Sequence, residues 1–238
     1  MNGFDHAILA FLNQFAFRFP RFDVAVGLIE SRHLFKGIAI MALFWAAWFL
    51  PESRSQKNRT ILICTIAGGL VALLFGRLLA LWLPFRVRPL YNLSLQMNFP
   101  VADPTAFLRT WSAFPSDHAM LWTAISFGIF LVSRRLGIVA LIYTALFICL
   151  PRIYMGLHHP TDVLAGALLG VLLVLVMCSG GVRKLVSSRA VHWSHQRQAG
   201  FYICFFLLTY GMGTNFDEVR GLAKQFSSPN APALVLSH

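Results

Sequence analysis

Long apolar segments separated by short charged ones constrain the fold of this chain more than any other feature of its sequence. A membrane-spanning helix needs roughly 17–25 largely apolar residues. Only 12% of the residues are charged, about half the share of a soluble domain, which argues against a soluble protein with an unusually apolar core. We therefore predict an all-α, polytopic membrane helix bundle that forms a single domain over residues 1–238, with a polar tail at 214–238. About six transmembrane helices are expected, at 34–50, 60–84, 117–133, 136–154, 161–180 and 200–213.

Basic residues are distributed unequally between the two ends of this predicted bundle. The formal net charge is +11, but the basic residues lie in short loops and form no continuous stripe, which argues against a nucleic-acid-binding protein. One side carries Arg54, Lys57, Arg59, Arg134, Arg135, Arg183, Lys184, Arg189 and Arg197. The loop at 85–115 on the other side carries Arg86, Arg88 and Arg109, and the turn at 155–160 carries no basic residue. Because basic loops stay cytoplasmic, we expect an integral multi-pass plasma (cytoplasmic or inner) membrane protein whose 85–115 loop faces the extracytoplasmic side.

The first residues predict an amphipathic helix rather than a cleavable signal peptide. The stretch MNGFDHAILAFLNQFAFRFPRFD has apolar residues at roughly helical spacing. It lacks a basic region before them and a small-residue cleavage site. We expect a helix at the membrane interface or packed on the bundle, broken near Pro20.

The stretch PRIYMGLHHPTD, residues 151–162, places polar residues between two apolar segments. Proline is favoured at the first position of a helix, so a helix should begin near 159–161, with Asp162 in its first turn. The Asp162 carboxylate can then accept a hydrogen bond from one ring nitrogen of His158, which leaves the other nitrogen free to act as a nucleophile. Arg152 is costly near hydrocarbon, and a bound anion or contact with lipid headgroups would offset that cost.

A second polar group is expected at the same membrane face, where the second helix ends and the third begins. In FPSDH, Ser116 lies at a helix N-terminus, a favourable place for phosphate, and His118 can act as a general acid. A plain N-cap serine with an interfacial histidine is the alternative. Arg86 and Arg88 offer guanidinium groups to phosphate oxygens or to headgroups. Arg77 precedes Arg88 by about three helical turns, so it points the same way if the helix continues that far.

Together these residues predict phosphoryl chemistry without a metal ion or other cofactor. Asp117, His158 and His159 lack the further well-spaced ligand that a closed metal site needs. The four cysteines lie far apart within apolar segments and are expected to be buried core residues. The economical chemistry is attack of His158 on phosphorus, with arginines stabilising the charge and His118 protonating the departing oxygen. Water would then hydrolyse the phosphohistidine.

On these residues the chain resembles the type 2 phosphatidic acid phosphatase superfamily, which has three motifs: Lys-x6-Arg-Pro, Pro-Ser-Gly-His and Ser-Arg-x5-His-x3-Asp. PRIYMGLHHPTD matches the third motif in spacing, PSDH matches the second, and Arg88-Pro89 matches the end of the first. The resemblance implies a six-helix membrane phosphatase with its motif core at 77–162. It also implies catalytic roles for His158 (nucleophile), Asp162 (its orienting partner) and His118 (general acid), and phosphate binding by Arg88, Ser116 and Arg152.

Three positions depart from these motifs. The lysine of the first motif is Leu81 here, so that phosphate contact is missing or comes from Arg77 or Arg86. The glycine of the second motif is Asp117, a carboxylate that would repel phosphate unless it turns away or pairs with an arginine. Pro151 replaces the serine of the third motif and removes a hydroxyl group.

The leading prediction is an enzyme that removes phosphate from a membrane lipid at the extracytoplasmic face. Its expected partners are the lipid phosphate substrate and membrane lipids. A polyprenyl diphosphate, such as an undecaprenyl carrier, is favoured over glycerolipid phosphates and lipid A because the chain is compact and nearly all membrane. The alternatives are a phosphotransferase, which passes the phosphoryl group to another lipid, and a non-enzymatic lipid-binding or transport protein.

Overall fold

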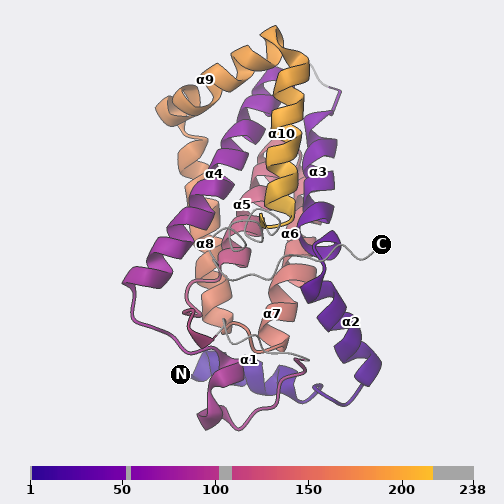
Figure 1. Cartoon of the computed structure of the whole chain (residues 1–238), viewed down its shortest axis with the longest axis vertical. Helices are drawn as coiled ribbons and strands as arrows, with labels where there is room; N and C mark the ends of the chain where they lie inside the picture. The colour runs from indigo at the N-terminus through magenta and orange to yellow at the C-terminus, as the bar shows by residue number, and fades with distance from the viewer. Residues whose placement is uncertain (1, 52–54, 102–108, 217–238) are drawn as a thin grey trace, which may run out of the picture.

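The computed structural model describes residues 2–51, 55–101 and 109–216, and these residues form helices and connecting turns but no β-strand. The helices run mostly along the long axis of the molecule (Figure 1). The α-helices are α1 (Gly3–Asn13), α2 (Pro20–Ser31), α3 (Ala39–Trp48), α4 (Ser55–Trp82), α5 (Asp117–Val132), α6 (Arg134–Tyr143), α7 (Leu150–Tyr154), α8 (Pro160–Met177), α9 (Gly180–Gln196) and α10 (Gln198–Gly213). Shorter π-helical or 3-10 turns are η1 (Leu34–Ile38), η2 (Pro89–Tyr91), η3 (Leu93–Leu95) and η5 (Thr144–Cys149).

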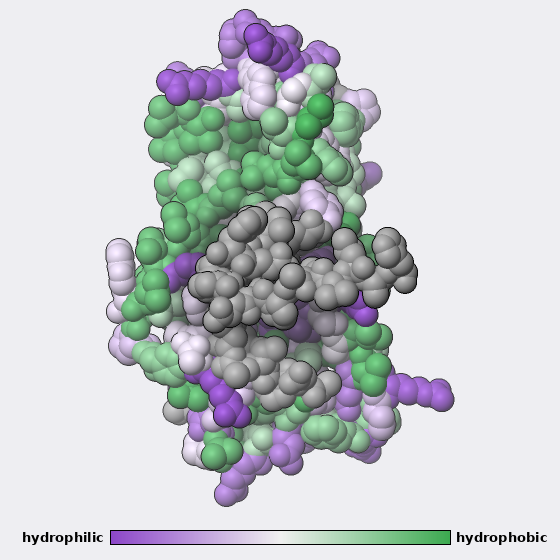
Figure 2. Space-filling view, in the orientation of Figure 1, coloured by the Kyte–Doolittle hydropathy of each residue, from purple (hydrophilic) through white to green (hydrophobic). Residues whose placement is uncertain are grey.

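Three helical stretches are long and apolar enough to cross a membrane, namely Gln56–Trp82, Arg134–Tyr154 and Pro160–Met177. The apolar helices Leu34–Trp48 and Asp117–Val132 are shorter. On the face shown in Figure 2, hydrophobic residues cover much of the upper half below a hydrophilic cap. The regular structure of the described residues is therefore all-helical, and it includes three candidate membrane spans.

Helix α5 lies at the centre of the bundle and packs against α4 and α8. Its contact with α8 is close because Gly166 and Gly170 carry no side chain. A Cβ atom at either glycine would collide with a backbone carbonyl oxygen of Ser116 or Met120. The backbone N–H of Ser116 also donates to the carbonyl oxygen of Asp162 at 3.1 Å. The starts of α5 and α8 are thereby held together.

The N-terminal segment forms two helices, α1 and α2, with the interruption where it was expected. Pro20 is the first residue of α2, a position that suits its fixed φ and missing N–H. In Figure 1, α1 lies across the lower end of the bundle, near the start of α8. Its buried residues are Leu9 and, unexpectedly for a carboxylate, Asp5.

The basic segment after α8 was expected to be a loop, and this expectation is wrong. Residues Gly180–Gln196 form helix α9, which lies across the end of the bundle opposite α1 (Figure 1). The pattern missed it because charged and apolar residues are mixed along the segment, with no long apolar stretch. The expected 85–115 loop does contain irregular chain with the turns η2 and η3, while its residues 102–108 lie outside the described ranges.

Candidate active site

His158 lies in the turn between α7 and α8 with only 2% of its surface exposed. Its Nδ1 is 2.8 Å from the carbonyl oxygen of Ala113, and its Nε2 is 3.3 Å from Nη1 of Arg88. Because a carbonyl oxygen only accepts, Nδ1 carries the proton and Nε2 keeps its lone pair. Burial, and then the charges of Arg88 and Arg152, hold the pKa of His158 well below its ordinary value. The site therefore presents a neutral imidazole with an unprotonated Nε2.

Two arginines next to His158 have buried donors that no described residue satisfies. Arg88 and Arg152 are 6% and 8% exposed. Burial, with the neighbouring charge of Arg152, lowers the pKa of Arg88 to about 10, so Arg88 stays charged at neutral pH. The Nε atoms of both guanidinium groups are buried, and neither has a hydrogen-bond partner within the described residues. Since buried donors are nearly always satisfied, these two atoms indicate a place where an anion binds.

Arg152 also connects His118 to two residues that sequence reasoning missed. Its Nη2 is 2.8 Å from Nδ1 of His118, and its Nη1 donates to Glu30 Oε1 at 3.0 Å. Lys36 Nζ lies 3.6 Å from the same Glu30 oxygen, with its side chain 8% exposed. An isolated lysine inside an apolar segment is a signal that would have found Lys36, because such charges are expensive in membranes and usually functional.

Asp117, the residue in place of the motif glycine, is paired with an arginine, one of the two arrangements expected for it. Its Oδ2 is 2.9 Å from Nη2 of Arg77, and its Oδ1 is 2.9 Å from Nδ1 of His118. The guanidinium of Arg77 therefore meets a carboxylate at the edge of the site. Helix α4 ends at Trp82, so the condition under which Arg77 and Arg88 would point the same way, one helix continuing to Arg88, is not met.

Asp162 contacts other partners than the one expected. Its carboxylate accepts hydrogen bonds from Arg86 and, at 2.7 Å, from the backbone N–H of His159. The expected hydrogen bond from His158 to Asp162 is wrong, because the Nδ1 proton of His158 is directed to the carbonyl of Ala113 instead. Asp162 therefore caps the start of α8, as its place in the first turn requires.

Arg86, expected to contact phosphate, is engaged with two carboxylates, Asp162 and Asp5. Its Nη2 lies 2.7 Å from Asp5 Oδ2, and its Nη1 donates to Thr161 Oγ1 at 3.0 Å and to Asp162. Asp5, which is fully buried, also accepts from the backbone N–H of Thr161 at 2.9 Å and from its hydroxyl at 2.7 Å. Helix α1 is thus bound to the start of α8. Asn2 Oδ1 accepts from the backbone N–H of Asp5 at 2.8 Å and caps the start of α1.

Ser116 is the N-cap of α5, which is the structural role given above as the alternative to phosphate binding. Its Oγ, fully buried, is 3.5 Å from the backbone N–H of Ala119. Within the described ranges no group of three or more His, Cys, Asp or Glu side chains is arranged to hold a metal ion. All four cysteines are free; Cys64 and Cys149 are buried as expected, whereas Cys178 is half-buried and Cys204 is exposed.

Comparison with known protein families gives a match over the part of the chain that contains His118 and His158. Residues 82–184 match the family model of the PAP2 superfamily. The chain is 33% identical over 127 residues to the bacitracin transport permease protein BcrC of Bacillus licheniformis, covering 52% of this chain and 57% of that protein. It is 37% identical over 84 residues to sphingosine-1-phosphate phosphatase 1 of Mus musculus, covering 32% of this chain and 20% of that protein. It is 26% identical over 137 residues to the undecaprenyl-diphosphatase of Sulfolobus acidocaldarius, covering 55% of this chain and 62% of that protein. The chain thus spans less than two thirds of each of these relatives, and no solved structure matches it.

Proposed function

We propose that this chain is a membrane lipid phosphatase that forms a phosphohistidine intermediate. The match of residues 82–184 to the PAP2 superfamily supports this proposal. One observation carries the proposal. The neutral Nε2 of His158 lies beside the buried guanidinium groups of Arg88 and Arg152, and the Nε donors of both groups have no partner in the described part of the chain. A nucleophile beside unsatisfied cationic donors is what attack on a phosphate group requires.

The reaction begins with attack of His158 Nε2 on phosphorus. A P–N bond forms while the bond between the terminal phosphorus and the oxygen of the departing group breaks; that group is the lipid alcohol of a phosphomonoester or the lipid monophosphate of a diphosphate. Arg88 and Arg152 bind the non-bridging oxygens and stabilise their charge. His118 donates a proton to the departing oxygen. Water then attacks phosphorus, His118 takes the proton of that water, and the P–N bond breaks to release phosphate and restore His158.

The remaining residues position these groups. Asp162 acts through the turn, because its carboxylate holds the backbone N–H of His159, the residue that follows the nucleophile. Arg86 acts on Asp162 rather than on phosphate. Asp117 and Arg77 form an ion pair that contacts His118, so we assign Arg77 to the support of the general acid.

A polyprenyl diphosphate is our proposed substrate. In favour of it, the undecaprenyl-diphosphatase of S. acidocaldarius aligns over 55% of this chain. A lipid phosphomonoester is the alternative, because sphingosine-1-phosphate phosphatase 1 aligns over 32% of it. Both are lipid phosphates, and the same buried arginines suit the terminal phosphate of either one.

For the membrane arrangement we propose six spanning helices in the plasma membrane, with the active site extracytoplasmic. The six expected segments overlap α3, α4, α5, α6 to α7, α8 and α10. The basic residues of α9 lie at the end of the bundle opposite α1 (Figure 1), which the positive-inside rule assigns to the cytoplasm. Arg54, also assigned to that side, lies outside the described residues. Helices α1 and α2 then lie at the extracytoplasmic interface.

Phosphate release by the purified protein in detergent, with a chelator present, tests the proposal. Undecaprenyl diphosphate and phosphatidic acid are offered separately. His158→Asn should abolish release, while His159→Asn, a change in the adjacent buried histidine whose Nε2 is 3.1 Å from the Val87 carbonyl oxygen, should retain it. A protein labelled with ³²P from the substrate should hold acid-labile phosphate only when His158 is present. Equal activity in the two variants would refute the assignment of the nucleophile.

The alternatives give different results in the same experiment. A phosphotransferase would transfer label to an acceptor lipid and release little phosphate without one. A binding or transport protein would retain the lipid phosphate in the His158→Asn variant and release none in either form.

A further inference from the structure

A groove opens directly beside His118. It has a volume of about 340 Å³ and lies between α4 and the end of α10. Its polar end is formed by Arg77, Asp117, His118 and Asn215. Asn215 Nδ2 is 3.2 Å from His118 Nε2, so the imidazole lies at the junction of the groove with the cluster around Arg152.

The rest of the groove is apolar. Leu70, Leu73 and Leu74 form one wall, and Phe216 lies on the other side. Leu73 and Leu74 follow Leu70 by three and four residues on α4, so all three side chains project from the same side of the helix. Leu74 is 63% exposed, which places this wall at the surface of the described structure. The groove thus leads from a proton donor to a hydrophobic surface.

The proposed reaction requires the lipid to leave from this position. His118 protonates the departing oxygen, which carries the lipid chain directly in a phosphomonoester and through the remaining phosphate group in a diphosphate, so the lipid must extend away from His118. We propose that this groove binds the proximal part of the substrate's isoprenoid or acyl chain, with Leu70, Leu73 and Leu74 as its contact surface. The proposal rests on the proposed function, because it takes His118 as the group nearest the departing oxygen.

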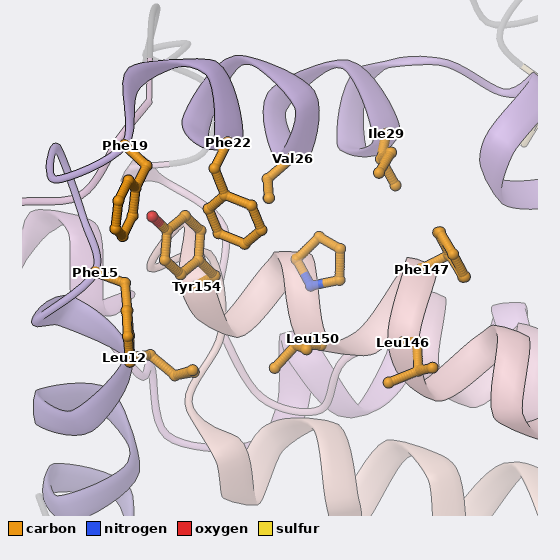
Figure 3. Close-up of a pocket in the computed structure, with 11 residues that line it drawn as sticks. Leu12, Phe15, Phe19, Phe22, Val26, Ile29, Leu146, Phe147, Leu150 and Tyr154 are labelled. Carbon is orange, nitrogen blue, oxygen red and sulfur yellow. The ribbon is translucent and has the colours of Figure 1, made fainter.

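A larger pocket on another face of the molecule has different properties. It measures about 530 Å³ and lies between α2 and the stretch 146–154, where Phe22, Val26, Leu146, Leu150 and Tyr154 point into it (Figure 3). None of its lining residues is charged, and the hydroxyl of Tyr154 donates to Asp23.

This pocket does not lead to the reacting atoms. At about 100° per residue on a helix, Arg152 projects about 160° away from Tyr154. The phosphate-binding arginine therefore faces away from the pocket, and neither His118 nor His158 lines it. By volume alone, this pocket would be the better binding site for the lipid chain. The position of the proposed proton donor, His118, favours the smaller groove instead.

A matched pair of substitutions separates the two sites. Leu74→Trp narrows the groove at an exposed position, and Leu146→Trp, at a residue 52% exposed, narrows the other pocket. Each variant is assayed with undecaprenyl diphosphate and with isopentenyl diphosphate, which has a single isoprene unit. We expect Leu74→Trp to raise KM for the long substrate about tenfold, the effect of about 1.4 kcal/mol, and to change KM for the short one less than about twofold. Leu146→Trp should leave both values unchanged. Leu73→Trp, on the same wall, should repeat the Leu74→Trp result.

Each other outcome overturns a defined part of the reasoning. If only Leu146→Trp raises KM for the long substrate, the chain binds in the other pocket and the proposal is wrong. If Leu74→Trp and Leu73→Trp impair both substrates equally, or neither, the groove does not recognise the lipid chain. If the unchanged protein releases phosphate from neither substrate, the proposed function fails and this proposal falls with it.

Discussion

The contact between Asp5 and the start of α8 gives the most direct test of how the site is held in place. Asp5→Asn keeps the size of the side chain but removes its charge. The carboxylate accepts from Arg86 and from both the N–H and the hydroxyl of Thr161. An asparagine retains one acceptor oxygen and places an NH₂ group, itself a donor, against these donors. At least one buried donor must therefore lose its partner.

The expected cost follows from burial. Removing one partner of a buried ion pair costs roughly 3–5 kcal/mol. The Arg86 side chain is 28% exposed, and it keeps Asp162 as a second partner, so solvent and that carboxylate reduce the cost. We therefore expect the free energy of unfolding to fall by about 2–3 kcal/mol, in the range for one unsatisfied buried polar group.

The effect on catalysis should exceed the effect on substrate binding. Thr161 lies three residues after His158, so loss of its anchor lets the turn shift relative to the arginines. A displacement of about 1 Å in an active site lowers rate by roughly 100-fold. We expect kcat to fall about 10- to 100-fold while KM changes less than about threefold, because Arg88 and Arg152 do not contact Asp5.

Two measurements on one preparation check this expectation. Equilibrium unfolding in mixed detergent micelles gives the free energy, and phosphate release gives kcat and KM. The control is His6→Asn, a change in the next residue of α1, which is exposed. If Asp5→Asn and His6→Asn agree in both stability and kcat, the bond between α1 and α8 has no role in setting the site and the reasoning is refuted.

Three further predictions concern the proposed phosphate site. The pKa of His158 is lowered by burial and by Arg88 and Arg152, so its folded value lies below the unfolded value of about 6.5. As the pH is lowered, kcat/KM for a short-chain substrate should begin to fall only below pH about 6.5. A fall that begins above that pH would contradict a neutral nucleophile. Because the pKa of His158 is lower in the folded protein than in the unfolded one, protonating His158 opposes folding. The free energy of unfolding should therefore decrease as pH falls below about 6.5. Arg88→Lys keeps the charge but removes Nε and the planar fork, and we expect kcat/KM to fall roughly 10- to 100-fold, the value of about one charged hydrogen bond. A lysine variant with unchanged kcat/KM would show that charge alone suffices there.

The sequence predicted the helices that carry the site because their signals are local. Pro160 begins α8, as the preference of proline for a first helical position indicated, and Ser116 caps α5. The arrangement of His158, Arg88 and Arg152 around one point also followed from motif spacing at helix ends. These features depend on hydropathy and on positions close in the chain.

The partners of the charged residues could not be predicted in the same way. Arg86 is taken by Asp5 and Asp162 rather than by phosphate, and Asp5 is 81 residues away from it in the chain. Ala113 directs the proton of His158 through a backbone carbonyl, which any residue type would supply. Such pairings are set by tertiary packing, and neither hydropathy nor residue type contains that information.

The contact between Asp5 and Thr161 also fixes an order of events during biosynthesis. The two residues are 156 positions apart, so at roughly 5–20 residues per second the second emerges about 8–30 s after the first. Until then the Asp5 carboxylate lacks both Thr161 donors, and Arg86 is the partner already synthesised among the described residues. A chain that stops before Thr161 therefore inserts its earlier helices without assembling the turn that holds His158. Such an incomplete product lacks the arrangement of His158, Arg88 and Arg152 on which the proposed hydrolysis depends.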